Sequence, residues 1–380
     1  YNPPASVRSY NYIHTLFGFN GKIENVEPSS ITVDGVSLET NAPMFCYGDI
    51  TVQNCPKFEI LYDEITATKS PSGIMFGINY IVATGKLTID NCPGFKLGLI
   101  DKTLYGGGGI AVIGNIKIED CKNFSIWSDI SSSNVINTTG NLVIENCPGF
   151  KIRSQGDAIE LSESTSTSER SVTINECKDF ELIALGGRGI VIDETYLADE
   201  WFCKSADVTI TNSENFKISA YSFGIEMLLT RSKECEKRVR IDTCPGFTIV
   251  GLEEQDVIFP FSESAIAFVE GDGSKNSTVE IKNSGKFKIY GAISANNTVT
   301  IDNCPDFLFE EKNTEYRNRQ SAIEGSKGVT ITNCPRFVIN MPDNGNGGIE
   351  TNGNVQIKNC PSFEISALSD WGKGIDIVPD

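Results

Sequence analysis

Two short acidic segments offer the most direct chemistry in this sequence. Glu270 and Asp272 belong to a Glu-Gly-Asp-Gly run, and Asp343 opens an Asp-Asn-Gly-Asn run. Carboxylate and carbonyl oxygens on a flexible backbone are the ligands that Ca²⁺ accepts. Neither run has the spacing of an EF-hand or of a calcium-binding nonapeptide repeat. We therefore take calcium as a candidate cofactor, with Glu270, Asp272 and Asp343 as ligands, and a solvated acidic turn as the alternative.

Aromatic residues outside any repeated pattern are the second lead. Trp127, Trp201, Trp371 and Tyr105 lie at the ends of expected strands or in inserted segments. Exposed aromatic rings of this kind can stack on the apolar faces of sugars. The alternative is that each ring covers a corner of the hydrophobic core. We take these four residues as candidate ligand-binding residues.

No arrangement of catalytic groups is recognisable. His14 is the only histidine, which argues against Ser-His-Asp and Cys-His catalysis and against histidine metal sites. A β-elimination site needs only a base and a group that neutralises a carboxylate, so a scattered site stays open. Basic residues in the expected corners are more typical of solvated charges than of bases; they are Arg153, Arg188, Arg231 and Arg336. The sequence assigns no catalytic residue.

These candidates are positioned by a phrase that recurs eleven times, of the form Φ-x-I-x-N-C-P-x-F-x-I. The phenylalanine occurs in every copy, at Phe58, Phe95, Phe124, Phe150, Phe180, Phe216, Phe247, Phe287, Phe307, Phe337 and Phe363. The copies are separated by connectors of unequal length. A constant unit with elastic connectors is typical of a solenoid, in which each repeat buries its apolar face against the next.

Three short strands are expected in each coil. Segments such as 329–331 and 337–339 alternate apolar and polar residues, and a small residue followed by Ile marks a third strand. The pattern predicts an all-β, right-handed parallel β-helix of about eleven coils over residues 46–380. A leucine-rich-repeat-like solenoid is the alternative. The coil between Phe287 and Phe307 has only twenty residues, which leaves no room for the helix of that fold.

The cysteines fit a ladder of buried thiols better than a disulfide framework. Nine of the twelve occupy the same position of the repeat, and two copies carry Ser213 and Ser284 there instead. A position that accepts both Cys and Ser is a small buried side chain. Cys203 and Cys235 lie off this ladder, and a bridge between them stays open. The Asn before the cysteine and the invariant Phe should stack along the axis in the same way.

The first 45 residues lack the phrase. Apolar residues recur at three- to four-residue spacing between Val7 and Phe17, which predicts a short amphipathic helix. We expect residues 1–45 to cap the open end of the solenoid, as terminal repeats require. After the last Gly-Ile strand only a few residues follow, and no cap is recognisable there.

Charge and hydropathy bound the partners. The net charge is −18 with 22% charged residues, which disfavours nucleic acid as a partner. No run of eighteen apolar residues occurs, so the sequence predicts no transmembrane segment. The sequence does not define an oligomeric state.

The late repeats carry a resemblance to a known group. Residues 321–333 read S-A-I-E-G-S-K-G-V-T-I-T-N, and residues 347–357 repeat the theme as G-G-I-E-T-N-G-N-V-Q-I. These coils resemble those of bacterial secreted or surface β-helix proteins, above all the calcium-carrying, polygalacturonate-binding, pectin-lyase-like group. The Cys-Pro corner and the invariant Phe depart from that group, and no binding residue matches. The resemblance implies a secreted or cell-surface polysaccharide binder.

Three functions are therefore open. The first is a non-catalytic, extracellular or cell-surface β-helix that binds polysaccharide, with calcium as a candidate cofactor. The second is a polysaccharide lyase or glycoside hydrolase acting on uronate polymers. The third is a purely structural adhesin or stalk. Fold analogy supports all three, so the site has to decide between them.

Overall fold

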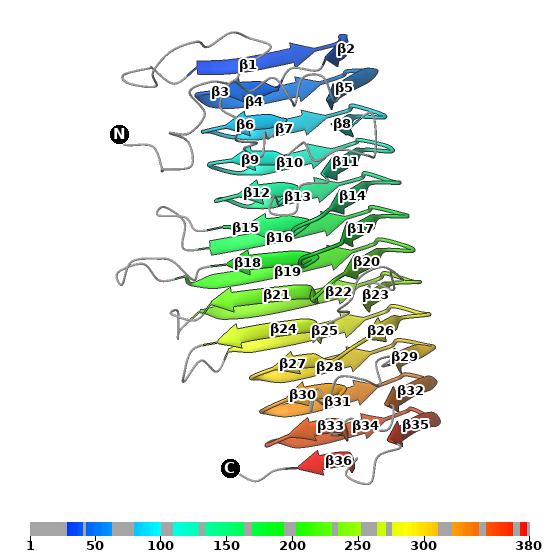
Figure 1. Ribbon diagram of the computed structural model, residues 1–380. Helices are drawn as coiled ribbons and strands as arrows, with labels where there is room; N and C mark the ends of the chain where they lie inside the picture. Colours follow the sequence, from blue (N-terminus) through cyan, green and yellow to red (C-terminus); the bar gives the residue numbers. More distant parts are fainter. Residues whose placement is uncertain are drawn as a thin grey trace.

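Short strands that alternate buried and outward side chains assemble into three parallel sheets of twelve strands each (Figure 1). The computed structural model describes residues 29–40, 43–62, 80–99, 109–128, 134–162, 169–193, 203–229, 235–251, 264–270, 276–310, 321–341, 347–367 and 373–377. Each coil contributes one strand to each sheet, so neighbours in a sheet are three strands apart in the sequence. The fold is a right-handed parallel β-helix, as the repeat predicts.

The three faces of the solenoid are sheets A, B and C. Sheet A contains β1 (Ser29–Asp34), β4 (Gly48–Gln53), β7 (Leu87–Asp90), β10 (Ile116–Glu119), β13 (Leu142–Glu145), β16 (Glu169–Asn175), β19 (Ser205–Thr211), β22 (Glu236–Asp242), β25 (Ser277–Lys282), β28 (Thr298–Asp302), β31 (Gly328–Thr332) and β34 (Asn354–Lys358). Sheet B contains β2 (Ser37–Thr40), β5 (Lys57–Tyr62), β8 (Lys96–Leu99), β11 (Ser125–Ser128), β14 (Lys151–Ser154), β17 (Glu181–Ala184), β20 (Lys217–Ala220), β23 (Thr248–Gly251), β26 (Lys288–Tyr290), β29 (Phe307–Glu310), β32 (Arg336–Met341) and β35 (Ser362–Ala367). Sheet C contains β3 (Met44–Cys46), β6 (Ile81–Ala83), β9 (Ile110–Val112), β12 (Ile136–Thr138), β15 (Ile159–Leu161), β18 (Ile190–Asp193), β21 (Phe223–Leu229), β24 (Ser264–Glu270), β27 (Ile293–Ala295), β30 (Ile323–Gly325), β33 (Gly347–Thr351) and β36 (Lys373–Ile377).

The core is a set of identical side chains stacked along the axis. The repeated phenylalanines form one continuous column; Phe95 and Phe124, for example, stack with ring centroids 4.6 Å apart and planes 2° apart. Columns of Ile and Val from the three sheets complete the interior. The strand spacing of roughly 4.8 Å puts equivalent rings at stacking distance, so the register of the sheets sets the aromatic geometry.

The corner between sheets A and B explains the Asn of the repeat. Asn54, Asn91 and Asn333 adopt positive φ, at 54°, 50° and 54°. Asn tolerates this left-handed conformation better than most residues. The side chains also form the expected ladder, since the Asn91 amide donates to Asn54 Oδ1 at 2.9 Å. The ladder was predicted from the sequence, whereas the backbone requirement was not.

All twelve cysteines are free, which confirms the thiol ladder. Cys92 Sγ donates to the carbonyl of Asp90 at 3.1 Å, and burial raises the pKa of the Cys244 thiol to about 11. At Ser213 the hydroxyl makes the same bond to Thr211, at 2.8 Å. The bridge left open between Cys203 and Cys235 does not form.

The solenoid has one coil more than the repeat indicates. Strands β1, β2 and β3 form a first coil that begins at Ser29, inside the range expected to be a cap. Its corner reads Gly35-Val36 in place of Asn54-Cys55-Pro56, because Asp34 is in register with Gln53 and Ser37 with Lys57. Leu38 is in register with Phe58. The amphipathic helix expected between residues 7 and 17 lies outside the described residues.

Candidate functional site

The outer face of sheet B carries a row of charged residues that the repeat does not specify. Side chains alternate between the two faces of a strand, so each strand presents the residue after the invariant Phe to solvent. In coil order this row reads Glu39, Glu59, Lys96, Ser125, Lys151, Glu181, Lys217, Thr248, Lys288, Leu308, Val338 and Glu364. Lys and Glu on neighbouring strands pair, as Lys96 does with Glu59 at 3.1 Å. Lys96 is half exposed, whereas Glu59 is 8% exposed. Pairs exposed on both sides, such as Lys57 with Glu39, contribute little to stability.

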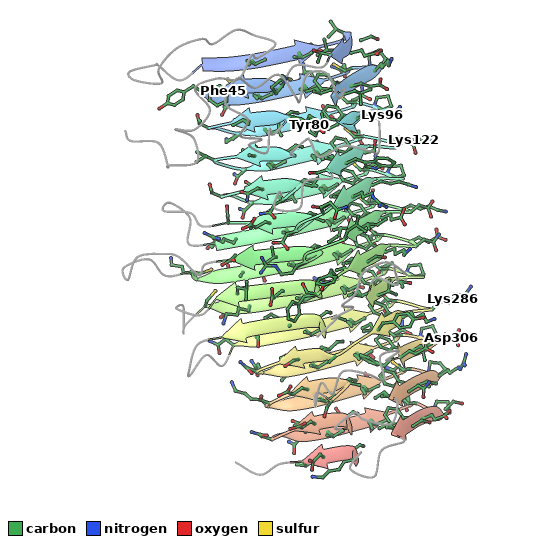
Figure 2. The ribbon with its side chains drawn as sticks, in the orientation of Figure 1. Phe45, Tyr80, Lys96, Lys122, Lys286 and Asp306 are labelled. Carbon is green, nitrogen blue, oxygen red and sulfur yellow. The ribbon has the colours of Figure 1, made fainter. Side chains whose placement is uncertain are left out.

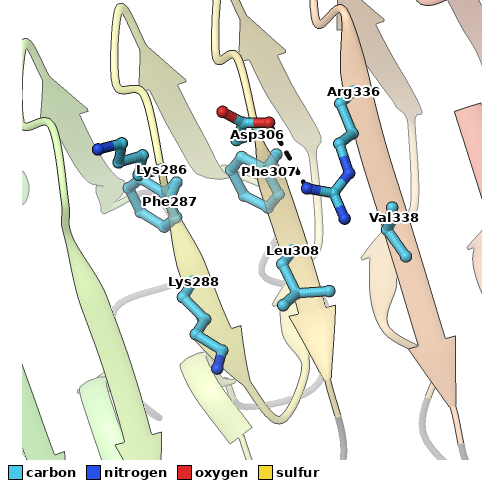
Figure 3. Close-up of a pocket in the computed structure, with 8 residues that line it drawn as sticks. All are labelled: Lys286, Phe287, Lys288, Asp306, Phe307, Leu308, Arg336 and Val338. Carbon is cyan, nitrogen blue, oxygen red and sulfur yellow. Dashed lines mark ion pairs between the residues drawn. The ribbon is translucent and has the colours of Figure 1, made fainter. Parts of the chain in front are cut away.

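The outer row of sheet B becomes apolar at Leu308 on β29 and Val338 on β32. Two apolar residues replace the charged or hydroxyl side chains of the earlier coils, and a hollow of about 340 Å³ lies over them. It is lined by Lys286, Phe287, Lys288, Asp306, Phe307, Leu308, Arg336 and Val338 (Figure 3). We call this feature the sheet B hollow. Leu308 and Val338 form its apolar floor, and the charged residues Lys286, Lys288, Asp306 and Arg336 form its rim.

Three cations stand around the rim. Lys286 forms no ion pair with any other described residue. Arg336 faces Asp306 across 3.7 Å, and both side chains are more than half exposed, at 69% and 52%. Figure 2 shows Lys286 and Asp306 projecting from the same edge of the solenoid as Lys96 and Lys122. The carboxylate of Asp306 therefore offsets only part of the positive charge.

Two neighbouring side chains hold Lys288 in place, on the side of the hollow away from Asp306 (Figure 3). Its ammonium lies 4.7 Å from the centroid of the Tyr290 ring and 3.5 Å from Glu310. Contact with Tyr290 and attraction to Glu310 raise the pKa of Lys288. The side chain is therefore charged at neutral pH and presents a fixed cation next to the apolar floor.

A second charged cluster lies on sheet C and is built differently. Arg188 precedes β18 and donates from Nη2 to Asp157 Oδ2 at 2.6 Å, from Nε to Asp157 Oδ1 at 3.0 Å, and from Nη1 to Glu226 Oε2 at 3.0 Å. Asp157 and Glu226 are 9% and 3% exposed. We call these three residues the Arg188 clamp. It ties three successive coils together through buried, charge-assisted hydrogen bonds.

Glu160 on β15 borders this clamp. Burial, reinforced by the negative charge of Asp157, raises the pKa of the Glu160 carboxyl to about 7. Asn137 donates to Glu160 Oε2 at 2.9 Å and accepts from the Ser162 hydroxyl at 2.9 Å. Glu226 also has a raised pKa, because burial outweighs its bond to Arg188. The fully buried Val191 stands between Glu160 and Glu226 in the register, so this cluster offers no open surface to a polymer.

Of the residues expected to bind ligand, one can be placed. Trp127 lies on β11, on the outer face of sheet B, with 36% of its surface exposed, and it stands in register with Arg153. It therefore belongs to the same face as the sheet B hollow. Trp201, Trp371 and Tyr105 lie outside the described residues.

The calcium ligands expected from the sequence cannot be placed together. Asp272 and Asp343 lie outside the described residues, and for Glu270 only the backbone of β24 is described. Within the described part of the chain, no group of three or more His, Cys, Asp or Glu side chains could hold a metal ion. The calcium site stays a prediction.

The hollow itself was missed in the sequence, although a signal for it exists. Leu308 and Val338 stand at a repeat position that carries Lys, Glu, Ser or Thr in most other coils. Arg336 was interpreted as a solvated charge in a corner. Only the strand register brings these residues beside Lys286 and Lys288. Comparing the outer positions of successive repeats would have shown the break in the pattern.

Known proteins give no direct guide to this site. The sequence matches no protein-family model, and no curated protein is significantly similar to it. No helix among the described residues is long and apolar enough to cross a membrane. The fold and the geometry of sheet B therefore carry the functional argument.

Proposed function

We propose that this β-helix is a non-catalytic protein that binds an acidic polysaccharide along sheet B. The observation that carries the proposal is the sheet B hollow, in which Lys286, Lys288 and Arg336 surround an apolar floor on a chain of net charge −18. A surface that gathers cations against the overall charge of the protein favours a local anionic ligand.

A uronic acid combines the two properties that this hollow complements. Its carboxylate suits the planar guanidinium of Arg336, which can donate two parallel hydrogen bonds. The C–H face of its ring suits Leu308 and Val338. Lys286 and Lys288 add charge from the preceding coil.

The shape of the face favours a polymer over a single sugar. Sheet B is one continuous sheet of twelve strands, and Trp127 lies on it six strands before Leu308, about 29 Å away at the usual strand spacing. A chain lying along the axis would contact the hollow and the exposed ring together. Several weak contacts on one chain give an avidity that a single exposed cation cannot.

Binding without catalysis fits the groups present. Hydrolysis of a glycosidic bond ordinarily uses two carboxyl groups, and among the described residues that line the hollow only Asp306 carries one. A lyase needs a group able to accept a proton, and the raised pKa of Lys288 disfavours that lysine as the base. The enzymatic alternative therefore finds no support at this site.

The proposal is tested by titrating the protein with oligogalacturonate in a calorimeter. Wild type should bind, and the double variant K286M/R336M should bind at least tenfold more weakly. The matched control is K117M, which removes a lysine from sheet A, away from the proposed binding face, where Lys117 pairs with Glu119. Equal binding by all three proteins would reject the proposal, and so would a wild type that binds neither oligogalacturonate nor a glycan with one carboxylate per disaccharide. Product formation in the same samples would favour the lyase or hydrolase.

Calcium and location enter as parts of the same proposal. The hollow supplies its own cations, so binding there should persist in a calcium chelator. A further gain on adding calcium would support the acidic segments that contain Glu270, Asp272 and Asp343. A polysaccharide of this kind would be met outside the cell or at its surface, where we propose that the protein acts.

A further inference from the structure

The rim of the sheet B hollow has an ordered pattern of charge along the axis. Lys288 is in register with Leu308, and Phe307 with Phe337, so Lys286, Asp306 and Arg336 occupy the same corner position in three successive coils. The pattern is positive, negative, positive. Successive members are separated by one strand spacing, roughly 4.8 Å, which puts the backbone positions of the two cations about 10 Å apart.

Among the described residues only Arg336 pairs with the Asp306 side chain, and the pair is loose, so Asp306 is available to a ligand. Its distance to Arg336 is 3.7 Å, and its side chain is 52% exposed. It adopts a positive φ of 60°, as Asn123 and Asn215 do at the same corner position in other coils, at 57° and 56°. The backbone therefore accepts Asn here as readily as Asp. The negative charge of Asp306 is not required by the fold.

We propose that Asp306 is a specificity-determining residue that sets the spacing of acidic groups along the bound polysaccharide. This inference rests on the proposed function and refines it. A glycan with acidic groups two strand spacings apart places one at Lys286 and one at Arg336. Its intervening neutral sugar then lies over Asp306 and donates hydroxyl hydrogen bonds to the carboxylate.

A more densely charged glycan meets a penalty at the same place. An acidic group over the middle coil faces the Asp306 carboxylate at close range. It also competes with that carboxylate for Arg336. Repulsion between like charges is a common means of excluding the wrong partner. The hollow should therefore prefer one carboxylate per disaccharide over one carboxylate per sugar.

The test compares wild type with D306N on two polymers of equal length. Hyaluronan oligosaccharides carry one carboxylate per disaccharide, and oligogalacturonate carries one on every residue. D306N should strengthen oligogalacturonate binding by about threefold to fivefold, the scale of an exposed charge pair, and change hyaluronan binding by less than twofold. The control D179N makes the same change at the same corner position, four coils before Asp306, where Asn215 donates to Asp179 at 2.9 Å. It should alter neither affinity.

The outcomes separate the two proposals. If wild type binds either polymer but D306N has no effect, or strengthens both equally, Asp306 does not select spacing and the inference is wrong. If wild type binds neither polymer, the proposed function fails and the inference falls with it. Thermal unfolding of D306N should coincide with that of wild type within a few degrees, which excludes a folding defect as the cause.

Discussion

The Arg188 clamp and the sheet B hollow both contain an arginine paired with a carboxylate, but the two pairs differ in burial. Each places one arginine beside a carboxylate of a neighbouring coil. In the clamp the arginine makes three bonds of 2.6–3.0 Å to carboxylates that are at most 9% exposed. In the hollow Arg336 faces a single carboxylate at 3.7 Å, and both side chains are more than half exposed.

On the proposal that sheet B binds a ligand, this difference in burial separates structural charges from binding charges. A buried charge that loses its partner is strongly destabilising, so the clamp is fixed by the fold. An exposed pair contributes little, so its arginine can exchange Asp306 for a ligand at low cost. Burial, more than residue type, decides which of the two arginines is free to bind.

The largest expected effect is on the free energy of unfolding when each of the two arginines is replaced separately. R188M leaves Asp157 and Glu226 buried without their cation and should lower the free energy of unfolding by about 3–5 kcal/mol. R336M should change it by less than about 1 kcal/mol. Denaturant unfolding measures both values. Similar losses for the two variants would contradict the comparison.

The clamp region should also give the protein a distinctive pH dependence. The Glu160 carboxyl has a pKa of about 7 in the folded protein, above its ordinary value of 4.5. The folded state therefore binds this proton more tightly than the unfolded state does. Stability should be unaffected by Glu160 below pH 4.5 and should fall as the pH rises towards 7.

E160Q isolates that contribution. Gln keeps an oxygen for the hydrogen bond from Asn137 and carries no charge. At pH 8 the variant should be more stable than wild type by about 2–3 kcal/mol, and at pH 4 the two should agree. E324Q is the control, since Glu324 stands in the outer row of sheet C and accepts a bond from Ser294 at 3.1 Å. A pH-independent difference for E160Q would show that burial does not perturb this carboxyl.

The apolar floor of the hollow should matter for binding and not for folding. L308T introduces the residue that Thr248 supplies at the same position two coils earlier. Loss of the apolar contact should weaken oligogalacturonate binding by about fivefold, while the melting temperature changes little. An unchanged affinity would mean that the ligand contacts only the charged rim.

The smallest expected effect is a difference in salt dependence between ligand binding at the hollow and stabilisation by the clamp. The Debye length falls from about 10 Å at 0.1 M ionic strength to 3 Å at 1 M, and exposed charges are screened first. Raising sodium chloride over this range should weaken ligand binding clearly and leave the clamp's contribution to stability nearly intact. The difference in stability between R188M and wild type at both salt concentrations checks the second part.

Much of the fold follows from the sequence because the core is made of repeated local choices. The invariant Phe and the Asn-Cys-Pro corner predict strands, corners and stacking, and the aromatic column and the amide ladder confirm them. The first coil cannot be recognised from the phrase, because Gly35, Val36 and Leu38 stand where the Asn, Cys and Phe of the phrase are expected.

The candidate site followed from the sequence only in part. The sequence offers Trp127 as a candidate sugar-stacking residue, with a ring that covers the core as the alternative. It is 36% exposed on the face that carries the hollow, and its role in binding stays a prediction. The hollow depends on which outer residues become neighbours across strands. Leu308 and Val338 are thirty positions apart in the chain, and only the register of β29 and β32 makes them adjacent. Interpreting every corner cation as solvated concealed Arg336.

The most direct test of the central claim is hydrogen–deuterium exchange of wild type with and without saturating oligogalacturonate. The ligand should slow exchange of backbone amides at positions 286–290, 306–310 and 336–340, which border the sheet B hollow. It should leave sheet C around the Arg188 clamp unchanged. Protection confined to sheet C or to sheet A, or no protection at all under saturating conditions, would contradict the account.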